Sequence, residues 1–163
     1  MDETVCAEGF GPGGCAVLVM AASPDAALRA AVREVLHRHG GRAGADNSVA
    51  YLFHPIGVLR VPGSRSLAAR ALEAGAEDVR PLRDGLVEVV TAPPDLPQVR
   101  DALARRGHVG RDAAVVRRAV GEVHLDPGQA LRLQSLLAEI RALAGVAQVY
   151  TNAAVPEQFL ATL

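Results

Sequence analysis

The sequence predicts an α+β fold of two small lobes, in which a ferredoxin-like domain at residues 57–121 is inserted into a discontinuous α/β domain of residues 1–56 and 122–163. Three observations lead to this prediction. Strand and helix patterns within 58–120 follow the order β-α-β-β-α-β. Only one helix and one strand follow Gly121, too little for a core of their own, so we expect them to pack on the first fifty residues. Half of the 163 residues are apolar, enough to form a core.

The first lobe is expected to open with two strands, at 4–7 and 15–21, around a glycine-rich loop. The second strand is the compact apolar run CAVLVMA, and the loop, EGFGPGG at 8–14, carries the glycines and proline of a tight turn. A helix is expected next, with Ser23 as its N-cap and Pro24 at its first position.

The apolar face of this helix repeats at helical spacing. Its members are Leu28, Val32, Val35 and Leu36. Gly40 and Gly41 are expected to end it. A strand at 49–53 follows, and residues 55–57 are expected to lead out of the first lobe.

The inserted domain is expected to hold four strands, at 58–61, 78–82, 86–91 and 113–120, and two helices, at 64–74 and 95–106. Asp84-Gly85 is the strongest turn signal in the chain, because this dipeptide favours a tight hairpin. Asp95 and Gln98 have the spacing of a capping box.

The last segment, after Gly121, is expected to form one helix and one strand of the first lobe. Asp126 and Pro127 are expected to start a long helix, Gly145 to close it, and a strand at 146–151 to follow. The apolar side of the helix carries Leu133, Leu136, Leu137, Ile140 and Leu143.

Composition restricts the possible partners. Eighteen acidic and seventeen basic residues give a formal charge of −1, so any nucleic-acid contact is expected to be local. Every basic residue is Arg, which suits phosphate binding but also reflects the bias of a GC-rich genome. No apolar run approaches the roughly 20 residues of a membrane span. The start, MDETVCAEGF, lacks a signal peptide, so we expect a soluble cytoplasmic protein.

Cys6 and Cys15 lie on either side of the glycine loop. Two alternatives are open: a bridge across the hairpin, or two buried free thiols in a reducing cytosol. No CxxC pair, His cluster or HExxH motif predicts a metal site, and no cofactor is expected.

Four separated blocks of the sequence resemble the YebC/PmpR family. They are EGFGPGG at 8–14, VREVLHRHGGRAGADNSVAYLF at 32–53, ALEAGAEDV at 71–79 and VYTNAAVP at 149–156, in the family's order. The family includes bacterial proteins labelled as transcriptional regulators and the mitochondrial translational activator of cytochrome c oxidase. The resemblance covers essentially the whole chain and implies the same two-lobe architecture. It also implies a non-catalytic regulator of gene expression that binds nucleic acid or the ribosome.

Two features depart from the family pattern. Family members ordinarily begin with a basic helical domain, and this sequence starts after it. The loop before the first helix usually carries an Asn-Arg-Asn-Arg type run, where this chain reads Ser-Pro-Asp-Ala-Ala at 23–27. These departures suggest an alternative function, a protein-interaction module that pairs with a full-length relative or competes for its partner.

The candidate binding residues form three groups. The first is the backbone of Gly11, Gly13 and Gly14, which is open to a phosphate or a flat partner, unless the loop is a plain turn. The second is a basic cluster at the end of the first helix: Arg33, His37, Arg38, His39 and Arg42. Arg33 occupies the place of a family arginine, although the helix dipole favours cations at this end regardless of function. The third is Arg105 and Arg106, for which a solvated surface is the alternative.

No pattern in the sequence predicts catalysis. Ser48 and His54 offer a nucleophile and a base, but no nucleophile elbow surrounds the serine. Aromatic residues for base stacking are scarce, since Tyr51, Phe53 and Tyr150 are expected in strands and in the core. A ferredoxin-like domain leaves a third function open, the binding of a small effector in a deep apolar pocket.

Overall fold

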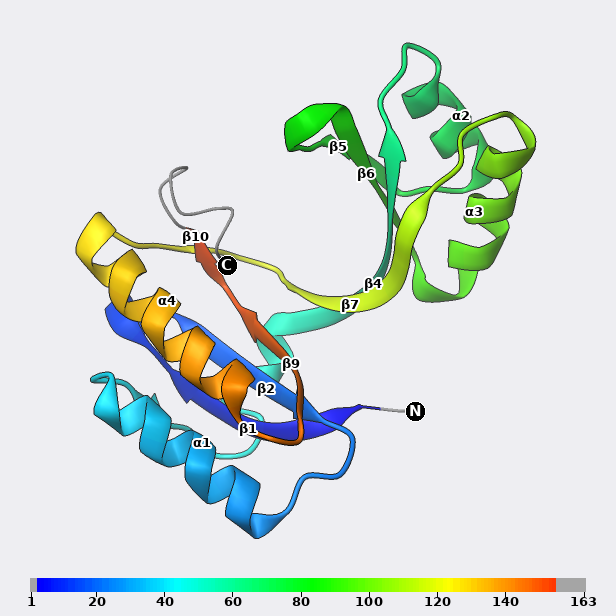
Figure 1. Ribbon diagram of the computed structural model, residues 1–163. Helices are drawn as coiled ribbons and strands as arrows, with labels where there is room; N and C mark the ends of the chain where they lie inside the picture. Colours follow the sequence, from blue (N-terminus) through cyan, green and yellow to red (C-terminus); the bar gives the residue numbers. More distant parts are fainter. Residues whose placement is uncertain (1–2, 155–163) are drawn as a thin grey trace. The chain divides into compact units, whose positions relative to one another are not determined.

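The computed structural model describes residues 3–154 and divides into two compact units (Figure 1). Unit 1 is Met1–His54 with Ala119–Leu163, and unit 2 is Pro55–Arg118. The chain enters unit 2 within β4 (Phe53–Pro62) and leaves it within β7 (Arg111–Ala119). The predicted α+β class, with a ferredoxin-like unit carried inside a discontinuous α/β unit, is confirmed.

Unit 1 is built on a four-stranded sheet in the order β3-β1-β2-β9. Its strands are β1 (Thr4–Phe10), β2 (Ala16–Ala21), β3 (Arg42–Ala43) and β9 (Val146–Thr151). β1 and β2 form a hairpin, and β9 pairs antiparallel with the other edge of β2. Because β2 lies inside a sheet that is covered on both faces, all six of its residues are buried.

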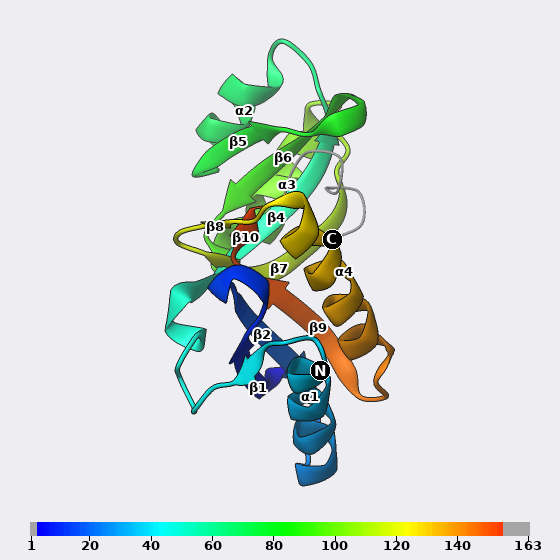
Figure 2. The ribbon, with the colours of Figure 1, turned by 90° about the vertical axis from the view of Figure 1, so that its left-hand side faces the viewer.

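Two helices, α1 (Ala26–Arg38) and α4 (Pro127–Ala142), lie on one face of this sheet (Figures 1 and 2). On α4 the fully buried side chains recur at helical spacing: Leu133, Leu136, Leu137 and Ile140. They pack in one core with Val32, Val35 and Leu36 of α1 and with Val17 and Val19 of β2. The C-terminal helix and strand therefore do pack on the first part of the chain, as predicted.

The other face of the sheet is covered by the segment that precedes β4. Val49 and Phe53 pack there against Leu18 and Met20 of β2. The strand predicted at 49–53 is instead a 3-10 turn, Ala50–Leu52, and β4 begins only at Phe53 and runs through the predicted link at 55–57. Tyr51 is consequently 67% exposed and is not a core residue. Phe53 and Tyr150 do pack together, with ring centroids 6.5 Å apart.

The helices begin near the predicted positions, but two of the predicted helix caps are wrong. Asp25 rather than Ser23 caps α1, because its carboxylate accepts the N–H of Leu28 at 2.7 Å. Asp95 makes no capping hydrogen bond, since a 3-10 turn, Pro93–Asp95, already leads into α3 with helical backbone angles. A full capping box is found at Asp126 and Gln129 instead, where each side chain bonds the backbone N–H of the other.

Unit 2 contains a four-stranded sheet in the order β5-β6-β4-β7. Its remaining elements are α2 (Leu67–Ala74), β5 (Asp78–Pro81), β6 (Leu86–Thr91) and α3 (Leu96–Arg105). Leu67 of α2 and Leu103 of α3 share one core with Leu59 of β4, so both helices cover the same face of the sheet. This is the ferredoxin-like arrangement. Asp84 and Gly85 both have positive φ angles, in the hairpin that their dipeptide predicted.

A short parallel pair, β8 (Val123–His124) and β10 (Ala153–Ala154), ends the described part of unit 1. The last two residues of the VYTNAAVP block, Val155 and Pro156, lie outside the described residues.

Both cysteines are free and buried. The hairpin register places Ala7 opposite Val19 and Phe10 opposite Ala16, so Cys6 and Cys15 do not face each other. A bridge would therefore require the hairpin to shift. Burial raises the pKa of both thiols above its ordinary value; the charge of Arg29 partly opposes this for Cys6, and a hydrogen bond to Thr151 does so for Cys15.

We expect both thiols to react slowly with an alkylating reagent in the folded chain and rapidly in urea, because the thiolate is the nucleophile and burial disfavours it. The raised pKa also makes stability depend on pH. Burial of the two thiols in their protonated form contributes to the free energy of unfolding below the ordinary thiol pKa, and this contribution is lost as the pH rises through the folded-state pKa. Mass spectrometry of the alkylated chain with and without urea, and urea midpoints measured across the alkaline range, would check both points. Rapid labelling of both cysteines in the folded chain would contradict the expectation.

Candidate functional site

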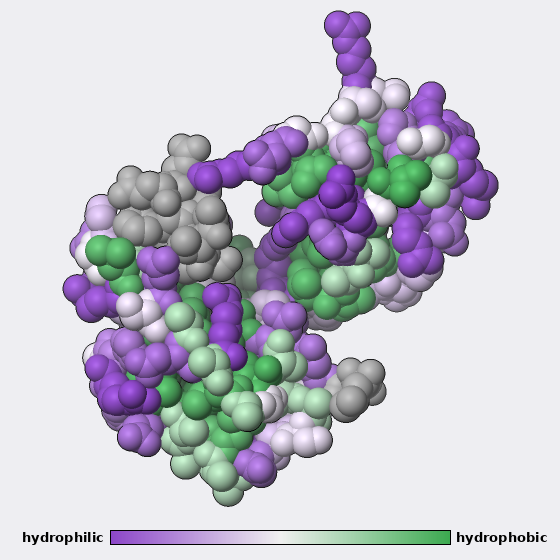
Figure 3. Space-filling model, in the orientation of Figure 1, coloured by the Kyte–Doolittle hydropathy of each residue, from purple (hydrophilic) through white to green (hydrophobic). Residues whose placement is uncertain are grey.

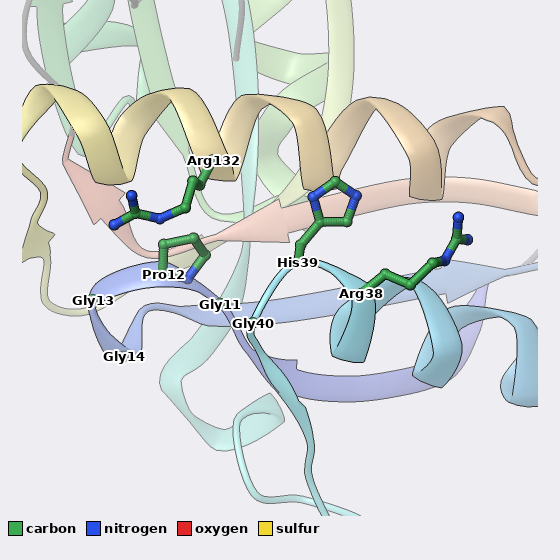
Figure 4. Close-up of a pocket in the computed structure, with 8 residues that line it drawn as sticks. All are labelled: Gly11, Pro12, Gly13, Gly14, Arg38, His39, Gly40 and Arg132. Carbon is green, nitrogen blue, oxygen red and sulfur yellow. The ribbon is translucent and has the colours of Figure 1, made fainter.

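A groove of about 630 Å³ lies beside the glycine loop of unit 1 (Figure 4). The glycine loop, the end of α1 and the first half of α4 supply its walls. Its lining residues are Gly11, Pro12, Gly13, Gly14, Arg38, His39, Gly40 and Arg132. The groove therefore brings together all of the first predicted group and two members of the second.

The glycine loop exposes its backbone to this groove. Gly13 and Gly14 are both exposed and have φ angles of +71° and +79°, in the left-handed region that favours glycine. A Cβ atom at Gly13 would lie 2.6 Å from Cδ2 of Leu125, whereas one at Gly14 would meet open space. No side chain at these two positions covers the peptide groups, so a partner can approach the backbone closely, although the N–H of Gly14 already donates to the carbonyl of Gly11 at 3.1 Å.

Two side chains at the end of α1, those of Arg38 and His39, share one carboxylate of α4. Nη2 of Arg38 lies 3.1 Å from Oε2 of Glu139, and Nε2 of His39 lies 3.0 Å from Oε1 of the same residue. These contacts hold the end of α1 against α4. The carboxylate of Glu139 also opposes the charge of Arg38, so the groove is less positive than the sequence suggests.

Arg132 is the groove cation without such compensation. It is exposed on α4 and forms no ion pair or hydrogen bond within residues 3–154. Figure 4 shows its side chain directed toward the glycine loop, while that of Arg38 points away from the loop. Arg132 is not among the predicted residues, because nothing local in the sequence distinguishes it from Arg141 on the same helix.

The other members of the basic cluster lie elsewhere in unit 1. Arg33 and Arg38 are five residues apart on α1, and at about 100° per residue their side chains point in different directions. Arg33 lines a separate hollow of about 460 Å³ beside β1, where Nε of Arg29 donates to the carbonyl of Cys6 at 3.2 Å. The guanidinium of Arg42 lies 4.7 Å from the centroid of the Phe10 ring. His37 is exposed in the last turn of α1 and does not line the groove.

Glu8, the first residue of the glycine-loop motif, is a buried acid that is also absent from the predicted residues. It is 7% exposed and accepts the backbone N–H groups of Asn47, Val49 and Ala50 at 2.6, 3.0 and 2.7 Å. Its carboxylate therefore anchors the segment before β4 and is fully occupied by the chain itself. The sequence placed Glu8 in the loop, whereas β1 continues to Phe10 and buries it.

The third predicted group lies in unit 2. Arg105 and Arg106 line a hollow of about 240 Å³ between α2 and α3, together with Arg70, Glu73, Ala74 and Ala102. Figure 3 shows hydrophilic residues, in purple, gathered over α3.

Other chemistry has little support in the described part of the chain. Oγ of Ser48 is buried and makes no hydrogen bond, so His54 does not activate it. Among residues 3–154 no group of three or more His, Cys, Asp and Glu side chains is placed to hold a metal ion. No described helix is long and apolar enough to cross a membrane.

Residues 2–153 match the family described as TACO1/YebC second and third domain. The chain belongs to this family. Similar TACO1/YebC relatives include the probable transcriptional regulatory protein MCA1220 of Methylococcus capsulatus, 41% identical over 99% of this chain and 66% of its own length. A probable transcriptional regulatory protein of Aeromonas salmonicida is 38% identical over 99% of this chain and 67% of its own. The chain thus spans about two thirds of the length of these relatives.

A solved structure shares the fold. The crystal structure of the conserved hypothetical protein Aq1575 from Aquifex aeolicus is 33% identical, with a TM-score of 0.84 over 98% of this chain and 67% of that one. The resemblance that the four sequence blocks predicted is therefore confirmed. The names of the relatives are those of regulatory proteins, which agrees with a non-enzymatic TACO1/YebC chain.

Proposed function

We propose that this chain is a non-catalytic regulator of gene expression that acts in the cytoplasm by binding nucleic acid, either free or within the ribosome. The proposed contact surface is the groove of unit 1. The observation that carries the proposal is the uncompensated guanidinium of Arg132 beside the exposed backbone of Gly13 and Gly14. The naming of the relatives as probable transcriptional regulators supports it.

The groove offers the groups that position a phosphate backbone. Arginine side chains and backbone N–H groups are among the usual partners of phosphate oxygens. Arg132 supplies a two-pronged donor, and the open space beside Gly14, where a Cβ atom would meet nothing within 4 Å, leaves room for a sugar-phosphate strand. Because the formal charge of the whole chain is −1, affinity for nucleic acid would come from the local positive charge at the groove and not from the net charge.

Arg132→Gln is expected to weaken binding about tenfold, because a hydrogen bond to a charged group is worth about 1.5–3 kcal/mol. Loss of one phosphate contact should also make the slope of log K against log salt shallower by about 0.7 for a single strand or 0.9 for a duplex. Fluorescence anisotropy with duplex DNA and single-stranded RNA, and co-sedimentation with ribosomes, each over a range of salt, would measure both effects.

Arg141→Gln is the matched control, because Arg141 is exposed in the last turn of the same helix and does not line the groove. Equal losses from the two variants would show that the groove is not the contact surface. A wild-type chain that binds none of the three probes at low salt but co-purifies with a protein would favour the alternative function, a protein-interaction module.

A further inference from the structure

Three arginines of unit 2 border the hollow between α2 and α3: Arg70, Arg105 and Arg106. Ala74 and Ala102, both half-buried, complete its lining with methyl groups only, which leaves space between the two helices. The apolar contacts that join the helices involve other residues, such as Leu67 and Leu103. The arginines add contacts between the helices only at the surface, where Arg70 and Arg106 bridge α2 and the end of α3.

The charges in this hollow are unbalanced. Its lining includes one carboxylate, Glu73, which is 67% exposed and lies 3.7 Å from Nη1 of Arg106. A pair this exposed contributes little. Nη1 of Arg70 donates to the backbone carbonyl of Arg106 at 3.4 Å, a neutral partner, and Arg105 forms no ion pair within residues 3–154. Three positive side chains thus face one negative one, in a chain of formal charge −1.

The helix dipole explains only part of this arrangement. Cations are favoured at the C-terminal end of a helix, which accounts for Arg105 and Arg106 at the end of α3. Arg70 also meets this end of α3, because it donates from α2 to the carbonyl of Arg106, but this hydrogen bond uses only one of its five N–H donors. Three arginines from two helices line one space, and such an arrangement can bind a phosphate through several forked donors.

We propose that this arginine hollow binds a phosphate group of a nucleic-acid backbone, as a second contact separate from the groove of unit 1. The assignment to nucleic acid depends on the proposed function, whereas the affinity for phosphate does not. The hollow takes the phosphate by charge and by paired N–H donors, and it reads no base, because its lining contains no aromatic or amide side chain.

The test uses the whole chain with Arg70→Gln and Arg105→Gln combined. The matched control combines Arg65→Gln and Arg100→Gln, which removes the same charge from exposed positions of unit 2 outside the hollow. In the wild type, the Nε–Hε signals of Arg70, Arg105 and Arg106 are expected to shift saturably in NMR spectra during titration with inorganic phosphate, but not with chloride at equal ionic strength.

Oligonucleotide binding supplies the second readout. The hollow variant is expected to bind about tenfold more weakly than the control variant, as for the loss of one charged hydrogen bond. Its salt slope should be shallower by about 0.7–0.9. Thermal unfolding at the same temperature in both variants would show that folding is intact.

Three other outcomes distinguish failure of the hollow, of its assignment to nucleic acid and of the groove in unit 1. Absence of a saturable phosphate shift, or equal weakening by both double variants, would overturn the site. Saturation by phosphate with unchanged oligonucleotide affinity in the hollow variant would overturn the nucleic-acid assignment and indicate a free phosphate ligand. If Arg132→Gln is silent while the hollow variant binds weakly, the groove fails as the contact surface and the hollow stands.

Discussion

Replacing Glu8 with Ala is expected to lower the free energy of unfolding by about 4 kcal/mol, because hydrogen bonds to a charged group contribute about 1.5–3 kcal/mol each and do not simply add. Three backbone N–H groups, those of Asn47, Val49 and Ala50, lose their acceptor together. Water cannot readily replace the carboxylate, because Glu8 is 7% exposed and the N–H of Val49 is buried with it.

The position of these N–H groups explains why Glu8 matters. Ala50 is the first residue of the 3-10 turn Ala50–Leu52, and the first N–H groups of any helix lack a partner within the helix. Val49 is the N-cap of this turn, and Asn47 lies in the loop before it. The adjoining residue of that turn, Val49, has no side-chain cap of its own. Glu8 thus performs from β1 the role that an N-cap residue usually performs locally.

Urea unfolding curves would measure the effect. An unchanged slope of the unfolding free energy against urea concentration would show that the folded and unfolded states are otherwise the same. Glu34→Ala is the control, because Glu34 is exposed on α1 and forms no hydrogen bond or ion pair among the described residues. Glu8→Gln should recover only part of the loss, since its amide NH₂ would face N–H donors. A Glu8→Ala chain that unfolds at the wild-type urea midpoint would contradict this account.

Replacing Gly41 with Ala is expected to destabilise the chain by about 3 kcal/mol, the upper part of the range for overpacking. A Cβ atom there would lie 2.3 Å from the carbonyl oxygen of Phe10 and 3.1 Å from that of Leu36. Both are backbone atoms, so relief requires β1 or the end of α1 to move. Movement would disturb the pairing of Phe10 with Arg42 and the 2.8 Å hydrogen bond from the N–H of Gly41 to Leu36.

Gly40→Ala is the matched comparison for this prediction. A Cβ atom at Gly40 meets nothing within 4 Å, and the only penalty is its φ of +78°. The left-handed conformation costs a non-glycine residue about 1–2 kcal/mol. Urea midpoints of the two variants should therefore show the larger loss for Gly41→Ala, and the opposite order would show that the close approach to Phe10 is not limiting.

The elements of this fold were largely predictable, because helix, strand and turn depend on residues close together in the chain. The apolar spacing from Leu133 to Ile140 predicted α4, and Asp84-Gly85 predicted a hairpin that the structure contains. The errors lie where a neighbouring segment changes the local context. Asp95 and Asp126 have the same capping-box spacing, yet only Asp126 forms the box, because a 3-10 turn precedes α3.

The candidate sites were predictable only in part. Local signals marked Gly13, Gly14, Arg38 and Arg105 as candidates, and four motif blocks were enough to indicate the family. Arg132, Glu139 and Arg70 carry no such signal, since their roles depend on which side chains another helix brings to the same space. Chain neighbours specify a helix and the face it buries, but the charge of a groove is decided by residues that meet only when distant helices pack on one sheet.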